Sequence, residues 1–300
     1  MHLIVGAGSI GTRTARLLAD EGQHVRLVTR SGSGPRHANI ELVAGHAADR
    51  GFLTDQAKGA EVIYNCANPQ YHEWPVVWPP MHASMLAAAE SSGAVLAITA
   101  PLYSYGPVTV PMTEDLPDAA PTVKGRVRAK MWADALAAHR AGRIRAVEVR
   151  ASDFVSPKYS VLETAVPAMK AGKTVRAPMP LDNPHSFTWV GDVATLLTVV
   201  ARDERAWGRV WNVPTPPPIT PRELIERTAR VGGYGTPKMS VYPMLAIRGV
   251  ALYDKFVKEF LEMRYQFERP FVLDSSAATK MFGLEPTPTD EAIRATLAEM

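Results

Sequence analysis

The chain has 300 residues, of which 46% are hydrophobic and 21% charged, and this balance excludes a disordered or collagen-like protein. The net charge of +3 comes from 33 Lys and Arg interspersed with 30 Asp and Glu, so neither nucleic acid nor a membrane is an expected partner. The single cysteine, Cys66, can form no intrachain disulfide, and no metal-ligand spacing is present, so no metal is predicted. A strand that begins at His2 leaves no room for a signal peptide, so we expect a cytoplasmic protein.

The first half of the chain alternates short β-rich runs with helical stretches. Because parallel strands need crossover connections, this alternation predicts an α/β fold of the Rossmann type, a doubly wound parallel sheet with helices on both faces. The predicted strands are Leu3–Val5, His24–Val28, Val62–Cys66, Val95–Thr99 and Ala146–Arg150, and the predicted helices are Thr12–Glu21, His82–Ser92 and Val127–Ala141.

A glycine loop, Gly6-Ala7-Gly8-Ser9-Ile10-Gly11, joins the first strand to the first helix. Gly6 permits a tight turn, Gly8 lets the backbone approach a pyrophosphate, and Gly11 lets helix and strand pack closely. The free N–H groups at the helix start then face the phosphates. The loop therefore predicts a dinucleotide site, with a glycine-rich turn that binds no ligand as the alternative.

The end of the second strand indicates which dinucleotide is bound. A chain that binds NAD places Asp or Glu near Thr29 to accept the ribose hydroxyls, whereas here Arg30 and Ser31 follow. Arg30 can pair with a 2′-phosphate, which a carboxylate would repel. NADP(H) is favoured over NAD, and a solvated loop cation is the alternative for Arg30.

After Asp153 the regular alternation of strand-like and helical segments ends, and Pro-rich stretches appear at Pro178–Pro184 and Pro214–Pro221. A helix at Trp189–Arg202 and a strand at Val210–Val213 nevertheless predict that the chain returns to the sheet. We expect residues 1–155 to form the NADP-binding domain, with its sheet completed by about 186–213. Residues 156–185 and 214–300 would form a smaller, interleaved C-terminal lobe that binds substrate.

The order of these segments resembles the extended and atypical short-chain dehydrogenases/reductases, which include epimerase/dehydratase-like and 3β-hydroxysteroid dehydrogenase-like enzymes. The segments that carry the resemblance are Gly6–Gly11, Gly45–Asp49, Asn65–Ala67, Tyr105-Gly106, Arg150–Pro157, Phe187–Ala194, Trp211–Val213 and Thr220–Ile225. The loop spacing itself looks atypical, and His46 stands where the family has an Asp near adenine. The residues expected to contact the dinucleotide are Gly6, Gly8, Ser9, Ile10, Gly11, Thr29, Arg30, Ser31, His46, Ala47, Ala67, Asn68, Thr99, Arg128 and Phe154.

The resemblance also implies a catalytic Tyr-x-x-x-Lys pair, which this chain lacks. Matching through Gly125 puts Lys124 at the Tyr position and Arg128 at the Lys position, whereas a rival register through Lys130 puts Arg126 at the Tyr position, and both lack the phenol. Arg128 could hold ribose or phosphate, but as a proton carrier it is poor because it stays protonated. Lys124 is a candidate acid/base group if burial depresses its pKa, and a surface lysine at a helix start is the alternative.

Two tyrosines follow the fifth strand, where ligands of doubly wound sheets collect. Either Tyr103 or Tyr105 could replace the missing phenol, although the resemblance favours a structural role for Tyr105. The Pro-interrupted loop that carries Tyr71, His72 and Trp74 could wall an aromatic substrate, or its tryptophans could fill the core.

Two further polar residues lie in the second half of the chain. Asp153 could meet the nicotinamide or substrate, but a turn cap is favoured, and His185 is favoured as a loop histidine. Tyr71, His72, Trp74, Tyr103, Asp153 and His185 complete the predicted substrate set.

Two hypotheses of function follow. The first is an NADP(H)-dependent oxidoreductase or epimerase-like enzyme that acts on a carbonyl or alcohol carbon of a small metabolite. The second is a non-catalytic NADP(H)-binding redox sensor that has lost the catalytic pair. The resemblance implies a homodimer through the helices near His82–Ser92 and Arg126–His139, although atypical members can be monomers.

Overall fold

A seven-stranded sheet forms the centre of the structure, a computed structural model that describes residues 1–300. All neighbouring strands in it are parallel. In spatial order they are β10 (Val210–Asn212), β6 (Arg145–Ala151), β5 (Val95–Pro101), β4 (Val62–Asn65), β1 (His2–Val5), β2 (Val25–Thr29) and β3 (Ile40–Ala44). The strand order confirms the predicted doubly wound fold.

The chain direction across the sheet reverses at β1, which lies between β2 and β4. In the register of the strands, Val5 is the partner of both Val28 and Asn65. The carboxyl ends of β1, β2 and β4 therefore meet at one edge, and in α/β sheets the crevice at such a reversal is where ligands bind.

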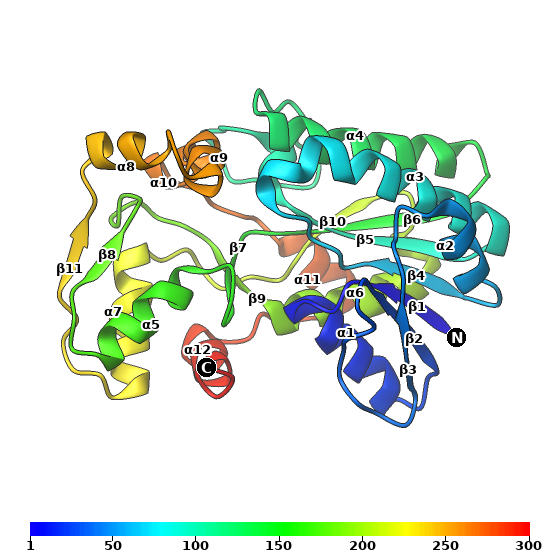
Figure 1. The fold of residues 1–300 in the computed structure, drawn as a ribbon, viewed down its shortest axis with the longest axis horizontal. Coiled ribbons are helices and arrows are strands. Elements are labelled where there is room, and N and C mark those ends of the chain that lie inside the picture. The colour runs from blue at the N-terminus through cyan, green and yellow to red at the C-terminus, as the bar shows by residue number, and fades with distance from the viewer.

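Helices cover both faces of this sheet, as Figure 1 shows. One face carries α1 (Ser9–Asp20) and α6 (Val190–Arg202), and the other carries α2 (Arg50–Gln56), α3 (Trp74–Ser92) and α4 (Val123–Arg140). Separate hydrophobic clusters fill the two interfaces, so the sheet is buried on both sides. None of the helices combines the length and the apolar character that crossing a membrane requires.

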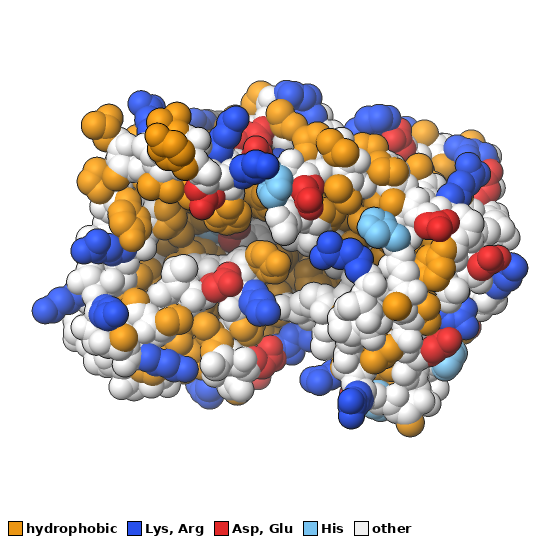
Figure 2. Space-filling view, in the orientation of Figure 1, with side chains coloured by type: hydrophobic (Ala, Val, Ile, Leu, Met, Phe, Trp, Pro, Cys, Tyr) orange, Lys and Arg blue, Asp and Glu red, His pale blue; other side chains and the backbone are white.

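A third hydrophobic cluster lies in the second lobe, at the carboxyl end of the sheet strands. Two small parallel pairs contribute to that lobe, β7 (Asp153–Val155) with β9 (Phe187–Trp189) and β8 (Val175–Ala177) with β11 (Met239–Val241). Its helices are α5 (Val161–Lys170), α7 (Pro221–Gly232), α8 (Met244–Val250), α9 (Lys255–Met263), α10 (Tyr265–Glu268) and α12 (Thr289–Leu297). Figure 2 shows a hollow between this lobe and the sheet, with hydrophobic side chains on its floor.

Short helical elements complete the chain. They are the 3₁₀ helices η1 (Tyr71–Glu73), η2 (Leu102–Tyr105) and η3 (Glu204–Ala206), and α11 (Ser276–Phe282) beside β10.

The largest difference from the prediction concerns α3, which was expected from His82 and begins at Trp74. Pro75, Pro79 and Pro80 led to the expectation of a loop, but Trp74, Trp78, Met81 and Met85 recur at helical spacing and are all buried. Burial of this apolar face outweighs the cost of the prolines. The prediction also missed β3 and α2, whose short lengths give little periodic signal.

Candidate functional site

The glycine loop has the backbone that a dinucleotide site requires. Gly6 has a φ of 101°, and a Cβ on Gly11 would lie 2.0 Å from the Gly6 carbonyl oxygen, so both positions exclude a side chain. A Cβ on Gly8 would meet nothing within 4 Å, so the space above the helix start is open. No side chain caps α1 and no acid lies in its first turn, which leaves its N–H groups free for an anion.

The end of β2 lies beside this loop and holds an unpaired cation. Gly6 N–H donates to the Val28 carbonyl at 2.9 Å, which fixes the loop against the strand. The Thr29 hydroxyl donates to the Ser33 carbonyl at 3.0 Å, and Ser31 and Ser33 share a hydrogen bond. Arg30 is exposed and makes no hydrogen bond or ion pair, so its guanidinium is available to a ligand.

The segment predicted to lie near adenine follows β3. The Gly45 N–H donates to the Thr29 carbonyl at 2.9 Å, and a Cβ at Gly45 would collide with the ring of Phe52. His46 is exposed and Ala47 is buried. Asp49 caps α2, because its side chain accepts from the Phe52 N–H at 3.0 Å.

Asn65 at the end of β4 connects three strands. Its Oδ1 accepts from the Ala67 N–H at 3.3 Å, and its backbone carbonyl accepts from the Thr99 hydroxyl at 2.8 Å. The Asn65 Nδ2 is buried and has no partner. Asn68 is exposed beyond it, and Phe154 packs on the opposite side, against the α1–α6 cluster.

Lys124 is buried, with 1% of its side chain exposed, so the alternative of a surface lysine is wrong. Its ammonium donates to two carboxylates from α9, Glu259 and Glu262, at 2.5 Å in the second case. The Glu262 carboxylate also accepts from the Val123 N–H. These two ion pairs join α4 to α9, which is a structural role for Lys124.

Arg128 lies one turn further along α4 and is also buried. Its guanidinium carbon is 4.5 Å from the ring centroid of Trp74 and 4.2 Å from that of Trp78. One amino group donates to the Thr99 carbonyl at 3.3 Å, and Nε has no partner. Burial lowers the pKa of Arg128 to about 10, so the group stays charged at neutral pH.

Tyr71 and Tyr103 meet through their hydroxyl groups. The ring of Trp74 stacks on Tyr103 with 6.0 Å between centroids, and its Nε1 donates to the Pro69 carbonyl at 3.1 Å. His72 is half-buried beside Tyr71 and makes no hydrogen bond or ion pair. The predicted substrate-binding residues Tyr71, Trp74 and Tyr103 therefore pack together as part of the hydrophobic core or against it.

Tyr105 points elsewhere, although only one residue separates it from Tyr103. Its ring covers the guanidinium of Arg150 at 4.6 Å, and Arg150 makes two hydrogen bonds to Asp118 and one to Glu148. Tyr105 belongs to a separate small hydrophobic cluster, which favours the structural alternative for it.

Asp153 and His185 form a pair, which the prediction of a turn cap and a loop histidine did not include. His185 Nε2 and Asp153 Oδ2 are 2.8 Å apart, and Nδ1 faces the Gln266 carbonyl at 3.3 Å. The His185 ring is buried and stacks on Phe267 at 4.6 Å. Asp153 begins β7, and its carboxylate retains 26% exposure.

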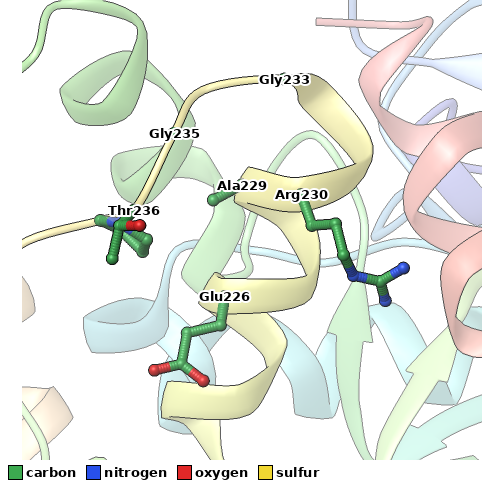
Figure 3. Close-up of a pocket in the computed structure, with 7 residues that line it drawn as sticks. Glu226, Ala229, Arg230, Gly233, Gly235 and Thr236 are labelled. Atoms are coloured by element: carbon green, nitrogen blue, oxygen red, sulfur yellow. The ribbon is translucent and has the colours of Figure 1, made fainter.

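A separate cavity of about 410 Å³ lies at the end of α7 (Figure 3). Its lining includes Glu226, Arg230 and Thr236, and none of the predicted site residues contributes. The crevice at the carboxyl edge of the sheet is the candidate site, because the glycine loop and the exposed Arg30 lie where the strand order reverses.

Comparison with known proteins identifies the family of the chain. The model of the NAD dependent epimerase/dehydratase family matches residues 2–213. The chain belongs to this family. The match includes every strand of the central sheet and ends one residue after β10, so the family assignment rests on the whole sheet.

Solved structures of epimerases and dehydratases share the fold at low sequence identity. UDP-glucose 4-epimerase from Thermotoga maritima has a TM-score of 0.81 at 16% identity, over 99% of this chain and 98% of that chain. dTDP-glucose 4,6-dehydratase from Bacillus anthracis, in complex with NAD, has a TM-score of 0.78 at 19% identity, over 99% and 96%. The Bordetella bronchiseptica enzyme WbmH, in complex with NAD+, has a TM-score of 0.75 at 19% identity, over the same shares. No curated protein gives a significant sequence match.

Three residues at the site of this epimerase/dehydratase family member were missed from the sequence. Glu259 and Glu262 hold Lys124, and Tyr265 has a buried hydroxyl without a partner beside the cleft. The i, i+3 spacing of the two glutamates puts them on one helix face, which was a detectable signal. Nothing in the sequence showed that α9 contacts η1, because about 180 residues separate the two elements.

Proposed function

We propose that this chain is an NADP(H)-dependent oxidoreductase or epimerase-like enzyme that acts on a carbonyl or alcohol carbon of a small metabolite, without the usual Tyr-x-x-x-Lys pair. The observation that carries the proposal is the combination of an open, uncapped α1 start with the unpaired Arg30 at the end of β2. The uncapped start of α1 suits a diphosphate, and Arg30 suits a 2′-phosphate.

The residues at the crevice fit a nicotinamide dinucleotide. Gly8 leaves room for phosphate, and the unpartnered Asn65 Nδ2 and Arg128 Nε offer buried donors that a ligand can satisfy. Such a cofactor supplies a hydride donor or acceptor when bound. Arg128 would contribute a fixed positive charge beside the end of β5, and Lys124 would hold α9 over η1.

The same proposal assigns a different ligand to each lobe. Residues 1–155, with 186–213, would bind the dinucleotide, and residues 156–185 and 214–300 would close over the substrate. We also propose a cytoplasmic homodimer that pairs through α3 and α4. Sedimentation of the purified chain tests the dimer.

Cofactor titration tests the proposal directly. The intrinsic fluorescence of NADPH and NADH is measured on titration with the wild type, Arg30→Ala and a control, Arg140→Ala. Arg140 is exposed at the last turn of α4, which leads to the amino end of β6. We expect Arg30→Ala to weaken NADPH binding about 10- to 100-fold, with NADH binding unchanged. An unchanged NADPH preference would remove the assignment.

A second candidate function is a redox sensor that binds NADP(H) without turnover. The observation that favours it is the pairing of Lys124, at the position expected for the catalytic Tyr, with two carboxylates. Tight binding of NADPH with no oxidation of it by a broad panel of ketones, aldehydes and sugar nucleotides would favour the sensor. A partner protein that binds only one redox form would support it further.

A further inference from the structure

We infer that the hydroxyl pair Tyr71–Tyr103 is the proton donor of this enzyme in carbonyl reduction, in place of a phenol on α4. The inference rests on the proposed function, since it needs a hydride donor at the same crevice. It is carried by the contact between the two hydroxyls at the carboxyl end of the sheet and by the chemistry of the neighbouring groups.

The pair lies beyond the carboxyl ends of two neighbouring strands and is packed among aromatic rings. Tyr103 lies in η2, directly after β5, and Tyr71 lies in η1, shortly after β4. Trp74 stacks on Tyr103 and also packs 5.1 Å from the Tyr71 ring. On the side of the second lobe, Phe256 of α9 lies 6.0 Å from the Tyr71 ring. Tyr71 is the more exposed of the two residues, and Tyr103 is buried.

Charged and titratable groups face the pair from four elements. Lys124 and Arg128 of α4 and Glu262 of α9 face Tyr71, with the Lys124 Nζ 5.3 Å from the centroid of its ring. Tyr265 of α10 faces Tyr103, and Asp153 of β7 faces both tyrosines. Burial, with a further contribution from Asp153, raises the pKa of Tyr103 well above its ordinary value. Burial likewise raises the pKa of Tyr71, against the hydrogen bond from Tyr103, which lowers it. Both phenols are therefore protonated at neutral pH, the form that can donate.

The other candidate donors are less suitable. The Lys124 ammonium is tied to two carboxylates, and the Arg128 guanidinium packs against the rings of Trp74 and Trp78. The Tyr105 ring lies over Arg150, in a different cluster. The hydroxyl pair carries exchangeable protons and lies just beyond the carboxyl ends of β4 and β5.

The proton and electron balance is as follows. The substrate carbonyl carbon accepts a hydride, for which the reduced dinucleotide is the two-electron donor, and the C=O π bond opens onto oxygen. The O–H bond of the phenol nearest the substrate breaks, and its proton forms the O–H bond of the product alcohol. The hydrogen bond between the two hydroxyls lets a proton pass from one phenol to the other, and solvent returns one proton to the pair at Tyr71, the more exposed residue. The substrate is reduced by two electrons and the dinucleotide is oxidised by two.

Three conservative variants test the inference. Tyr71→Phe and Tyr103→Phe each remove one hydroxyl of the pair, and Tyr64→Phe is the matched control. Tyr64 is buried with an unpartnered hydroxyl, and it belongs to the hydrophobic cluster on the opposite face of the sheet. NADPH oxidation is followed with isatin as the carbonyl probe, and NADPH affinity and Tm are measured for every variant.

We expect kcat to fall about 100-fold or more in each pair variant, with NADPH affinity unchanged, because a general acid contributes on that scale. The double variant should be no worse than the worse single variant, since the pair acts as a unit. In the pair variants kcat should fall as the pH rises through neutrality, because solvent must supply the proton, whereas the wild type should show no such fall. A structural role would not produce this pH dependence.

Two results would overturn the inference in different ways. If the wild type reduces isatin and both pair variants keep kcat within about twofold of it, another group donates the proton and the proposed function survives. If the wild type binds NADPH but reduces neither isatin nor benzil, the proposed function fails and the inference fails with it.

Discussion

The carboxyl edge of the sheet has two halves that are built in different ways. The half around β1 and β2 is open: Gly8 faces empty space, the start of α1 is uncapped, and Arg30 has no partner. The half around β5 and α4 is packed: Lys124, Arg128 and the two tyrosines are held by groups from η1 and α9. The open half needs only local backbone geometry to bind an anion, whereas the packed half depends on contacts between distant segments.

The difference shows how substitutions should act. In the open half, the fold tolerates changes that affect a ligand, because the ligand space lies outside the packed protein. In the packed half, the same side chains support both the site and the junction between the lobes. Stability and site chemistry are therefore separable at positions of the open half that face the ligand space, such as Gly8 and Arg30, and linked in the packed half.

Gly11→Ala should give the largest effect, because its Cβ would lie 2.0 Å from the Gly6 carbonyl oxygen and would force the loop from the helix. We expect a loss of about 3 kcal/mol in the free energy of unfolding, together with loss of NADPH binding. Gly8→Ala is the matched change: its Cβ meets nothing, so we expect a loss below about 1 kcal/mol and weaker NADPH binding. Urea denaturation and NADPH titration measure both quantities. Equal destabilisation by the two variants would contradict the description of an open half.

Lys124→Met tests the packed half. It leaves Glu259 and Glu262 without their buried cation and loosens α9 from α4. Removal of one partner of a buried ion pair costs about 3–5 kcal/mol, and we expect about 2–3 here because both carboxylates are partly exposed.

Lys130→Met is its control on the same helix, since Lys130 is exposed and pairs only with Asp134. We expect a change below about 0.5 kcal/mol for this variant, again by urea denaturation. A Lys124→Met protein as stable as the control would show that the contact between the lobes contributes little to folding.

His82 gives the packed half a pH dependence. It is buried on α3, with 3% exposed, and burial lowers its pKa to about 4. Because the folded state binds the proton more weakly than the unfolded chain, the stabilisation is present above about pH 6.5 and is lost as the pH falls toward about 4.

Between about pH 7 and about pH 5 we expect His82 to account for a loss of about 2 kcal/mol. Urea midpoints of the wild type and His82→Gln across this range measure it, and the variant should show the smaller decrease. A parallel decrease in both proteins would assign the acid sensitivity to other groups.

The sequence was most informative where function depends on the backbone. The glycine spacing between a strand and a helix predicted the turn at Gly6 and the close approach at Gly11, because these needs are met within a few residues. It was less informative at α3, where prolines suggested a loop and buried tryptophans determined a helix. The roles of Lys124 and of the Asp153–His185 pair were not predicted, since both depend on partners that are distant in the chain.

By itself, then, the sequence determined the doubly wound sheet, the glycine loop and the presence of Arg30 where an acid would be expected, because local periodicity and steric limits on glycine act over short ranges. Only the tertiary structure decided which groups meet in the packed half of the carboxyl edge, around β5 and α4. It placed Glu259 and Glu262 against Lys124 and joined Tyr71 to Tyr103. The physical reason is that charge compensation and hydrogen bonding between buried side chains depend on distances in space, which the packing of the second lobe on the sheet sets.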